Sequence, residues 1–385
     1  MVRIGVVGVG KMGLSHLSIL GSHPDVQVGL VCDSSAYLTS VLGKKTPFEC
    51  VRDYSALLDP KAGLDAIVVA TPSRSHYPLV RDAIERGIHV FCEKPLTLRA
   101  ADSESLACKA RERSVITQVG YHNRFVASFE EVKRLLDLAA IGRVTHARAQ
   151  AYGPVVIRQQ GQTWRSRKDE GGGSLYDYAA HPLDLLTWYL GRPQSVAGSV
   201  LGTIFSQEID DEVYSTLYYP DGATAQLSVN WSDESYRKMS TSVEIWGTKG
   251  RITADRQECQ VYLRDEASLP AGYGLGWNTR YTTDLTQPVW FYLRGEEYSA
   301  ELDYFVKSVK LSKENNPRKT FQNSFADAAA TDAAIEMILR DGRNGRRTYA
   351  DQAAGTSAPA VVAYPSALRS LLSKLTNALP GRFGR

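Results

Sequence analysis

The sequence lacks the features that mark several classes of protein. Its 385 residues contain five cysteines, and no two of them form a Cys-x-x-Cys pair. Neither a disulfide framework nor a structural zinc site fits this pattern, so we expect no metal and a cytoplasmic location, where thiols stay reduced. No uninterrupted apolar run approaches the ~20 residues that a membrane-spanning helix needs. The apolar N-terminus leads directly into a glycine motif, which indicates a β-strand and not a signal peptide.

Strong charge of either sign is also missing. The formal net charge is +3, from 45 basic and 42 acidic residues. Basic residues form no stripe interleaved with aromatic side chains, so we expect no nucleic-acid partner. Hydrophobic residues make up 43% and charged residues 23% of the chain, which is typical of a packed globular protein. The length favours about two domains.

What the sequence does have begins with a strand, a glycine turn and a helix. Val2–Val7 is a β-branched run, typical of a strand buried on both faces. In the turn that follows, the first glycine allows a tight bend, the second lets the backbone approach a pyrophosphate, and the third lets the helix pack close to the strand. The helix N-terminus then presents unpaired N–H groups to the phosphates. We therefore expect a dinucleotide to bind at Gly8, Gly10, Lys11, Met12 and Gly13.

A second predicted strand, Val26–Cys32, ends at Asp33, close to the ~20 residues expected downstream of the motif. A carboxylate at this place accepts hydrogen bonds from the adenosine ribose hydroxyls and repels a 2′-phosphate. Ser34 and Ser35 follow, with no Arg or Lys beside them, so we expect NAD to be preferred to NADP. The alternative is an ordinary βα turn with Asp33 as a strand-end cap, and the complete βαβ context argues against it.

The α/β alternation continues to about residue 120 and predicts a doubly wound parallel sheet. Ligands of such sheets bind at the carboxyl ends of the strands. The residues at these ends are therefore candidates for the site, namely Thr71-Pro72, Glu93-Lys94-Pro95 and Tyr121-His-Asn123-Arg124.

Four segments together resemble the glucose-fructose oxidoreductase, inositol dehydrogenase and rhizopine catabolism (Gfo/Idh/MocA) family of oxidoreductases. They are Gly8–Gly13, Thr71-Pro72 with the following His76, Glu93-Lys94-Pro95, and Gly171-Gly-Gly-Ser-Leu-Tyr-Asp177-Tyr-Ala-Ala-His181-Pro-Leu-Asp184. The resemblance spans about residues 1–340. The family often has Gly where this chain has Ala179, which is a small change on a helix.

The resemblance implies an NAD-binding Rossmann domain over residues 1–121 and a substrate domain over residues 122–345. In the second part, Val126–Leu138 reads as a helix, and Pro220-Asp221-Gly222 is a hairpin signal between two strands. The family implies one large open, mostly antiparallel sheet whose outer face often mediates dimers or tetramers. The predicted strands are Val144–Tyr152, Ser195–Phe205, Glu212–Tyr219, Thr224–Trp231, Ser242–Gly247 and Arg251–Ala254, and the predicted closing helices are Ala300–Lys310 and Phe325–Leu339.

Lys94, Asp177 and His181 form the catalytic set that the resemblance implies. Lys94 would bond both a nicotinamide ribose hydroxyl and the substrate hydroxyl, next to a cis peptide bond at Pro95. Asp177 and His181 stand four residues apart on a predicted helix and share a face. A carboxylate beside an imidazole raises its basicity, which suits His181 as the general acid/base and Asp177 as the group that orients it or the substrate. An isolated Asp-x-x-x-His is more often structural, and here the glycine run and the family match favour function.

Other residues at the strand ends and before the glycine run have two interpretations each. Trp164 and Arg165 suit a sugar ring and an anionic group, and fit equally well as a core aromatic and a surface ion-pair partner. Tyr121 and Arg124 are candidates for contact with the substrate and Asn123 for contact with the cofactor. Arg124 fits equally well as a brace between the domains. We expect His76 to support the turn at Thr71-Pro72 beside the cofactor.

These features predict an NAD-dependent oxidoreductase that moves a hydride between the nicotinamide and a secondary hydroxyl or ketone of a sugar, cyclitol or nucleotide sugar. One alternative is a glycoside hydrolase or epimerase that uses bound NAD transiently. Another is a non-catalytic nucleotide sensor, which would not need Lys94, Asp177 and His181 together. The loops over residues 153–168 and 269–290 are expected to select the substrate.

Residues 346–385 are predicted to form a separate tail. Asp351–Pro365 is rich in Ala, Ser, Gly and Pro, which is typical of a linker. Ser366–Leu379 places leucines on one helical face, with arginine and lysine residues around them. We favour docking of this stripe on the protein itself or on a sister subunit, because such stripes are usually buried against protein. Peripheral contact with an anionic membrane surface is the alternative.

Overall fold

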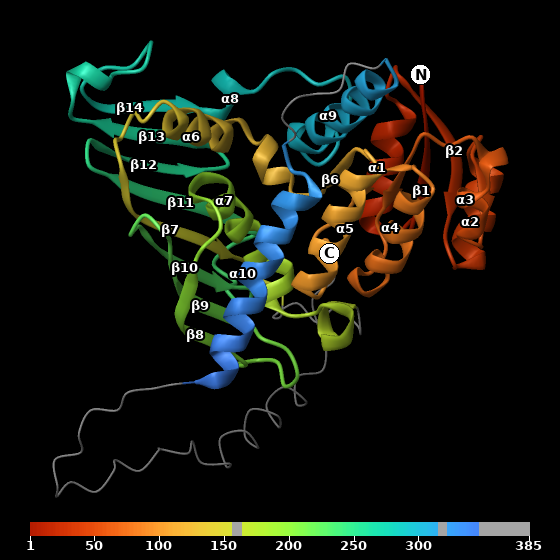
Figure 1. Ribbon diagram of the computed structural model, residues 1–385, viewed down its shortest axis with the longest axis horizontal. Helices are drawn as coiled ribbons and strands as arrows, with labels where there is room; N and C mark the ends of the chain where they lie inside the picture. The colour runs from red at the N-terminus through yellow and green to blue at the C-terminus, as the bar shows by residue number, and fades with distance from the viewer. Residues whose placement is uncertain (156–163, 315–321, 346–385) are drawn as a thin grey trace, which may run out of the picture. The chain divides into compact units, whose positions relative to one another are not determined.

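A six-stranded parallel sheet occupies the N-terminal part of the chain (Figure 1). The strand order is β3-β2-β1-β4-β5-β6, with the reversal between β1 and β4 where ligands of doubly wound sheets bind. The doubly wound sheet predicted from sequence is confirmed. Its strands are β1 (Val2–Val7), β2 (Val26–Cys32), β3 (Glu49–Val51), β4 (Ala66–Val69), β5 (His89–Cys92) and β6 (Thr117–Val119).

This computed structural model describes residues 1–155, 164–314 and 322–345. The predicted linker and tail helix, and the middle of the predicted substrate loop over residues 153–168, lie outside the described residues. No helix in these three ranges is long and apolar enough to cross a membrane. All five cysteines are unpaired, and Cys32 and Cys92 are buried core residues.

Helices cover both faces of the parallel sheet. On one face, α1 and α9 pack against β1 through residues such as Ile4, Leu17 and Phe305. On the other face, Val80 of α4 and Leu106 of α5 join the larger core. The helices of this part are α1 (Lys11–Gly21), α2 (Ala36–Lys45), α3 (Ser55–Leu58), α4 (His76–Glu85), α5 (Ala100–Glu112) and α9 (Glu296–Lys313).

The position of α9 corrects the expectation that this helix closes the second domain. Its apolar stripe, which includes Leu302, Phe305 and Val309, fills the face of the parallel sheet beside α1. The helix also begins at Glu296 and not at Ala300. The chain therefore returns to the first sheet after building the second one.

The second sheet has eight strands in the order β14-β13-β12-β11-β7-β10-β9-β8. Only β7 and β10 pair in parallel among these strands, so the predicted mostly antiparallel sheet is confirmed. The strands β13 and β14 were not predicted, and β14 lies inside the expected substrate loop over residues 269–290. The bounds are β7 (Val144–Tyr152), β8 (Ser195–Gly202), β9 (Glu212–Tyr218), β10 (Thr224–Asn230), β11 (Ser240–Gly247), β12 (Gly250–Asp255), β13 (Glu258–Leu263) and β14 (Gly276–Tyr281).

Helix α10 links the two sheets. It packs against α5 of the first part and against α7 and β8 of the second (Figure 1). Its N-terminus has a capping box, in which the side chains of Ser324 and Asp327 bond each other's backbone N–H groups.

The predicted domain boundary between residues 121 and 122 falls after β6, just before a short 3-10 turn, and stays a prediction. The remaining helices are α6 (Ala127–Asp137), α7 (Ala180–Leu190), α8 (Thr282–Leu285) and α10 (Phe325–Asn344).

Candidate functional site

The turn between β1 and α1 has the close contacts that the glycine motif predicts. Gly8 has φ of 85°, and a Cβ there would lie 2.8 Å from Ala70 O. A Cβ on Gly13 would collide with Gly8 O, so strand and helix touch through this glycine. A Cβ on Gly10 would meet no atom within 4 Å. Gly10 is therefore not required by the packing, and it borders open space at the N-terminus of α1.

No side chain caps the first turn of α1, which contains the exposed Lys11 and the half-buried Met12. In the part of the chain that the structure describes, no side chain accepts from these first N–H groups, which is the setting in which helix N-termini bind phosphates. Together with the space beside Gly10, this makes the turn a good fit for the pyrophosphate of a dinucleotide.

Asp33 stands at the end of β2, next to the glycine turn. Its Oδ2 accepts a hydrogen bond from Val9 N at 2.8 Å, and its Oδ1 accepts one from Ser35 N at 2.8 Å. The carboxylate thus ties the two turns together, and each oxygen keeps a further lone pair for a ligand. One expectation needs correction, because a basic residue does lie close by. Arg52, from beyond β3, donates to Ser34 O at 3.3 Å.

His76 lies behind the turn at Thr71-Pro72 and is completely buried. Its Nδ1 lies 2.9 Å from Pro95 O and its Nε2 lies 2.9 Å from Thr71 O. Burial outweighs these bonds and lowers the pKa of His76. The imidazole connects the loop after β4 with the loop after β5, which agrees with the expected support of the turn and leaves it no open face for a cofactor.

Glu93 makes its contacts inside the protein. Its Oε1 bonds Nε2 of the buried His16 at 2.7 Å, and its Oε2 accepts from Lys94 N at 3.2 Å. Burial would raise the pKa of Glu93, and the His16 bond together with the charges of His16 and Lys94 outweighs it, so that the pKa is lowered. A Cβ on Gly120 would press on this carboxylate at 3.1 Å. The peptide bond between Lys94 and Pro95 is cis, as the resemblance implied.

Lys94 and Asp177 meet directly. Lys94 Nζ donates to Asp177 Oδ1 at 2.9 Å and to Asp177 O at 2.8 Å. On the other side, Arg165 Nε donates to Asp177 Oδ2 at 2.8 Å. Burial would raise the pKa of Asp177, and the charges and hydrogen bonds of the two cations hold it below its usual value. One buried carboxylate is thus shared by a lysine and an arginine.

This arrangement corrects the expected contact between Asp177 and His181. Asp177 lies in a π-helical turn, Leu175–Ala179, which runs into α7. Its two oxygens bind the cations, and among the described residues His181 has no hydrogen-bond partner at Nδ1. The pKa of His181 is lowered well below its usual value, first by burial and then by the positive charges of Lys94 and Arg256, because all three effects oppose protonation.

Aromatic rings surround His181. The rings of His181 and His122 lie 4.9 Å apart edge to face, and His122 stacks on Tyr298 at 4.6 Å. Tyr121 lies edge-on to His181 at 6.4 Å and is completely buried. His122 lies in the strand-end segment that was a candidate for the site, but sequence reasoning gave it no role of its own and did not identify Tyr298.

Arg256, which follows β12, was also missed. Its guanidinium pairs with the buried Glu297 of α9, and its Nη1 lies 3.4 Å from Asn123 Oδ1. Asn123 Nδ2 is buried without a partner among the described residues. Arg256 comes from the second sheet and Glu297 from a helix on the first sheet, so only the folded structure brings them to Asn123.

Arg124 fits the second of its two interpretations. It is 1% exposed, and its Nε and Nη2 donate to the two oxygens of Asp184 at 2.8 and 2.7 Å. A guanidinium used in this way has no surface left for a substrate, so Arg124 braces the turn after β6 against α7. Trp164 is half-buried, and the Cζ atom of Arg165 lies over its ring, 4.8 Å from the ring centroid.

Two family models match the chain. One describes an oxidoreductase family with an NAD-binding Rossmann fold and matches residues 2–121. The other describes the GFO/IDH/MocA C-terminal domain and matches residues 129–253. The chain belongs to the Gfo/Idh/MocA oxidoreductase family. The first match contains the glycine turn and Lys94, and the second contains Asp177 and His181.

Curated members of the Gfo/Idh/MocA family resemble the chain over about two thirds of its length. A scyllo-inositol 2-dehydrogenase (NAD(+)) from Bacillus subtilis is 28% identical, over 65% of this chain and 73% of that protein. A 2,7-anhydro-N-acetylneuraminate hydratase from Escherichia coli is 29% identical, over 69% and 70%. A dTDP-3,4-didehydro-2,6-dideoxy-alpha-D-glucose 3-reductase from Streptomyces antibioticus is 30% identical, over 66% and 76%.

A solved structure shares the whole fold of this Gfo/Idh/MocA member. Levoglucosan dehydrogenase, in complex with NADH and levoglucosan, superposes with a TM-score of 0.76 at 22% identity. The match covers 89% of this chain and 97% of that one. It therefore includes both sheets and confirms the two-part architecture.

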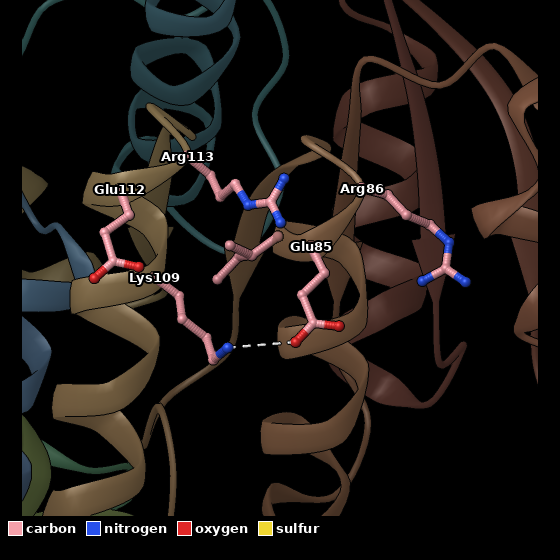
Figure 2. Close-up of a pocket in the computed structure, with 6 residues that line it drawn as sticks. Glu85, Arg86, Lys109, Glu112 and Arg113 are labelled. Carbon is pink, nitrogen blue, oxygen red and sulfur yellow. Dashed lines mark hydrogen bonds and ion pairs between the residues drawn. The ribbon is translucent and has the colours of Figure 1, made fainter.

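A surface hollow of about 460 Å³ lies away from these residues, between the C-terminal ends of α4 and α5. Figure 2 shows its charged lining, in which Lys109 Nζ lies 3.4 Å from Glu85 Oε1. None of the residues predicted for the site lines it. The candidate site of this family member is instead the carboxyl edge of the parallel sheet, because Lys94 bonds Asp177 there and lies close enough to His181 to lower its pKa.

Proposed function

We propose that the chain is an NAD-dependent oxidoreductase that acts on a secondary hydroxyl or ketone of a sugar, cyclitol or nucleotide sugar. The observation that carries this proposal is the contact of Lys94 with Asp177 beside His181, at the carboxyl edge of a dinucleotide-binding sheet. Relatives named for inositol oxidation and nucleotide-sugar reduction support the substrate class.

The cofactor residues follow from the fit of the glycine turn. Gly8, Gly10, Lys11, Met12 and Gly13 would hold the pyrophosphate, and Asp33 the adenosine ribose. Around the nicotinamide, the candidates are Thr71, Pro72, Glu93, Lys94, Pro95 and Asn123. Bound NAD would supply the hydride acceptor or donor, and the protein supplies orientation and proton transfer.

The two titratable groups beside the substrate have different tasks in this proposal. His181 is kept neutral by burial and by two cations, so it can accept the hydroxyl proton when the alcohol carbon loses its hydride. Lys94 donates a hydrogen bond to the same oxygen and stabilises negative charge on it. Asp177 positions the lysine ammonium. In the reverse direction His181 returns the proton to the carbonyl oxygen.

The test mixes the purified chain with NAD and a panel of cyclitols, sugars and nucleotide sugars and follows NADH absorbance at 340 nm, a property of the cofactor. Net NADH with at least one substrate is the expected result. NAD binding without turnover or product on any compound would contradict the proposal.

A second candidate has specific support, because one relative is named as a hydratase. In that case NAD would be reduced and reoxidised within one turnover, as in the epimerase or hydrolase alternative. Product formation without net NADH, measured by chromatography of the same reactions, distinguishes it from a dehydrogenase.

We also propose that copies of the chain assemble through the open face of the second sheet. The outward side chains of β13 and β14 include Tyr262, Trp277 and Tyr281, which are 37%, 58% and 53% exposed. Large exposed aromatic groups in a row are typical of a surface covered by a partner. Light scattering of the purified chain measures its mass in solution, and a mass of one chain would contradict the proposed assembly.

A further inference from the structure

Four cationic side chains gather around the proposed reaction site. Lys94 and Arg165 share Asp177, and Arg256 pairs with Glu297. Arg294, the fourth, stacks on the ring of Tyr298 at 5.4 Å and has no carboxylate partner among the described residues.

Fewer carboxylates than cations stand in the same place. Besides Asp177 and Glu297, Glu93 lies next to Lys94. Glu301 is also near, but burial and the charges of Glu93 and Glu297 raise its pKa well above the usual value, which favours its neutral form. Among the described residues, the four cations Lys94, Arg165, Arg256 and Arg294 thus outnumber the three carboxylates Asp177, Glu93 and Glu297 beside them, and the oxidised nicotinamide ring of bound NAD would add one more positive charge.

The excess of positive charge lowers the pKa of two imidazole rings, those of His181 and His122. After burial, the groups that lower the pKa of His181 are Lys94 and Arg256. Those that lower the pKa of His122 are His181 itself, Arg256, Lys94 and Arg294. The charged groups that act most strongly on the two rings are thus cations and, for His122, the neighbouring imidazole. The space beside His181, where a substrate hydroxyl must lie, is thus electrostatically positive.

Arg165 is placed so that its guanidinium can bind an anionic group. Its Nε is fixed on Asp177, its guanidinium plane rests on Trp164 at 4.8 Å, and its side chain is 39% exposed. The turn that carries it is held tightly, because a Cβ on Gly172 would collide with Arg165 O. A guanidinium anchored through Nε leaves its two Nη groups to form a fork, which matches the two oxygens of a carboxylate or phosphate.

We propose that the substrate carries an oxyanion, either a carboxylate or a phosphate. Arg165 binds this oxyanion through its Nη groups, while Lys94 and His181 contact the reacting hydroxyl. This inference rests on the proposed function and names its substrate class. Acidic sugars supply a carboxylate and nucleotide sugars supply phosphates.

The test compares matched compounds on the complete protein. Binding of glucose, glucuronate, galactose, galacturonate and UDP-glucose to the NADH complex is measured by calorimetry, and turnover with NAD is measured at 340 nm. An acid or the nucleotide sugar should exceed its neutral partner by about 10- to 100-fold in affinity, the range expected for hydrogen bonds to a charged group.

Arg165→Gln should remove most of this preference by weakening the binding of the anionic compound, and Arg165→Lys should restore part of the preference. Arg167→Gln is the matched control. Arg167 lies two residues away on the same loop, 3.7 Å from Asp169 and 3.5 Å from Glu170, and its loss should leave the ratio unchanged.

The outcomes separate this inference from the proposed function. Preference for the uronates assigns a carboxylate, and preference for UDP-glucose assigns a phosphate. Equal or better binding of the neutral sugars, equal loss in Arg165→Gln and Arg167→Gln, or no binding of any anionic compound would overturn the inference, even if neutral sugars reduce NAD. Anion binding that depends on Arg165 without any turnover would instead uphold it and count against the dehydrogenase.

Discussion

Asp332 of α10 allows a quantitative prediction about the packing behind Lys94. The side chain is 3% exposed. Its Oδ2 accepts hydrogen bonds from Ser103 Oγ at 2.6 Å and Thr97 N at 3.3 Å, and its Oδ1 is buried without a partner among the described residues. Burial outweighs these bonds and raises the pKa of Asp332 from 3.8 to about 7.

The sign of the effect on stability follows from proton linkage. The folded state keeps a proton on Asp332 in a pH range where the unfolded chain has lost it. Its contribution to the free energy of unfolding is thus complete below pH 3.8 and is lost as the pH rises to about 7. At about 1.4 kcal/mol per pH unit, the whole interval amounts to ~4 kcal/mol, and the part between pH 5 and pH 7 to ~2 kcal/mol.

Asp332→Asn removes the titration and keeps the shape of the side chain. Urea unfolding of the NAD-free protein at pH 5, 6, 7 and 8 measures the free energy of unfolding of both proteins. We expect the native chain to lose ~2 kcal/mol more than the variant between pH 5 and pH 7, with equal dependence on urea. Ser103→Ala, which removes a bond to the ionised carboxylate, should displace the loss to higher pH. Parallel curves for the native chain and Asp332→Asn would refute the reasoning.

Three further predictions concern the site. Lys94→Ala and His181→Ala should each lower turnover by ~10²- to 10⁴-fold while NADH binding, followed by fluorescence, is kept; activity within a few-fold of the native chain removes that residue from the mechanism. Asp33→Asn combined with Ser34→Arg, beside Arg52, should raise the ratio of NADP to NAD affinity in a titration, and an unchanged ratio contradicts the role of the carboxylate. Gly13→Ala should lower the melting temperature and abolish dinucleotide binding because its methyl group meets Gly8 O, whereas Gly10→Ala, whose methyl group meets no protein atom, should weaken binding alone.

The first sheet was predictable because its signals are local. The strands β1, β2, β4 and β5 are short, largely apolar runs, and the glycine turn fixes its own geometry through contacts among neighbours in sequence and β4. The strand β3 has three residues and none of them is buried, and it was not predicted. The strand β13 alternates partly exposed and buried side chains, as a strand signal should, and it was nevertheless not predicted. The strand β14 was harder, because it lies at the edge of the second sheet and none of its residues is fully buried. Gly276, Asn278 and Arg280 in β14 give no strand signal, and pairing with β13 determines their conformation.

The site was predictable only where a motif carries it. Lys94, Asp177 and His181 stand in such motifs. Of the two roles predicted for Asp177, orienting His181 or the substrate, the first does not fit, because spacing along a helix says nothing about the cations Lys94 and Arg165 that bind its carboxylate. Arg256 and Tyr298 come from two further elements; Arg256 acts on His181 and His122, and Tyr298 stacks on His122. Their roles depend on contacts between residues that are far apart in the sequence, which no local pattern encodes.

The position of Lys94 illustrates how such distant contacts give the motif its function. Its own N–H is held by Glu93, the following Pro95 O by His76, and Thr97 N by Asp332 of α10. Its ammonium is held by Asp177 of the second part of the chain. Three of these four partners come from outside the loop, so the conformation of the loop depends on the packing of both sheets and α10. A lysine fixed in this way loses little further freedom when a substrate binds, and this preorganisation is what a proton-transfer site requires. The tripeptide marks where the lysine is in the sequence, and the packing of the other elements decides where its ammonium lies.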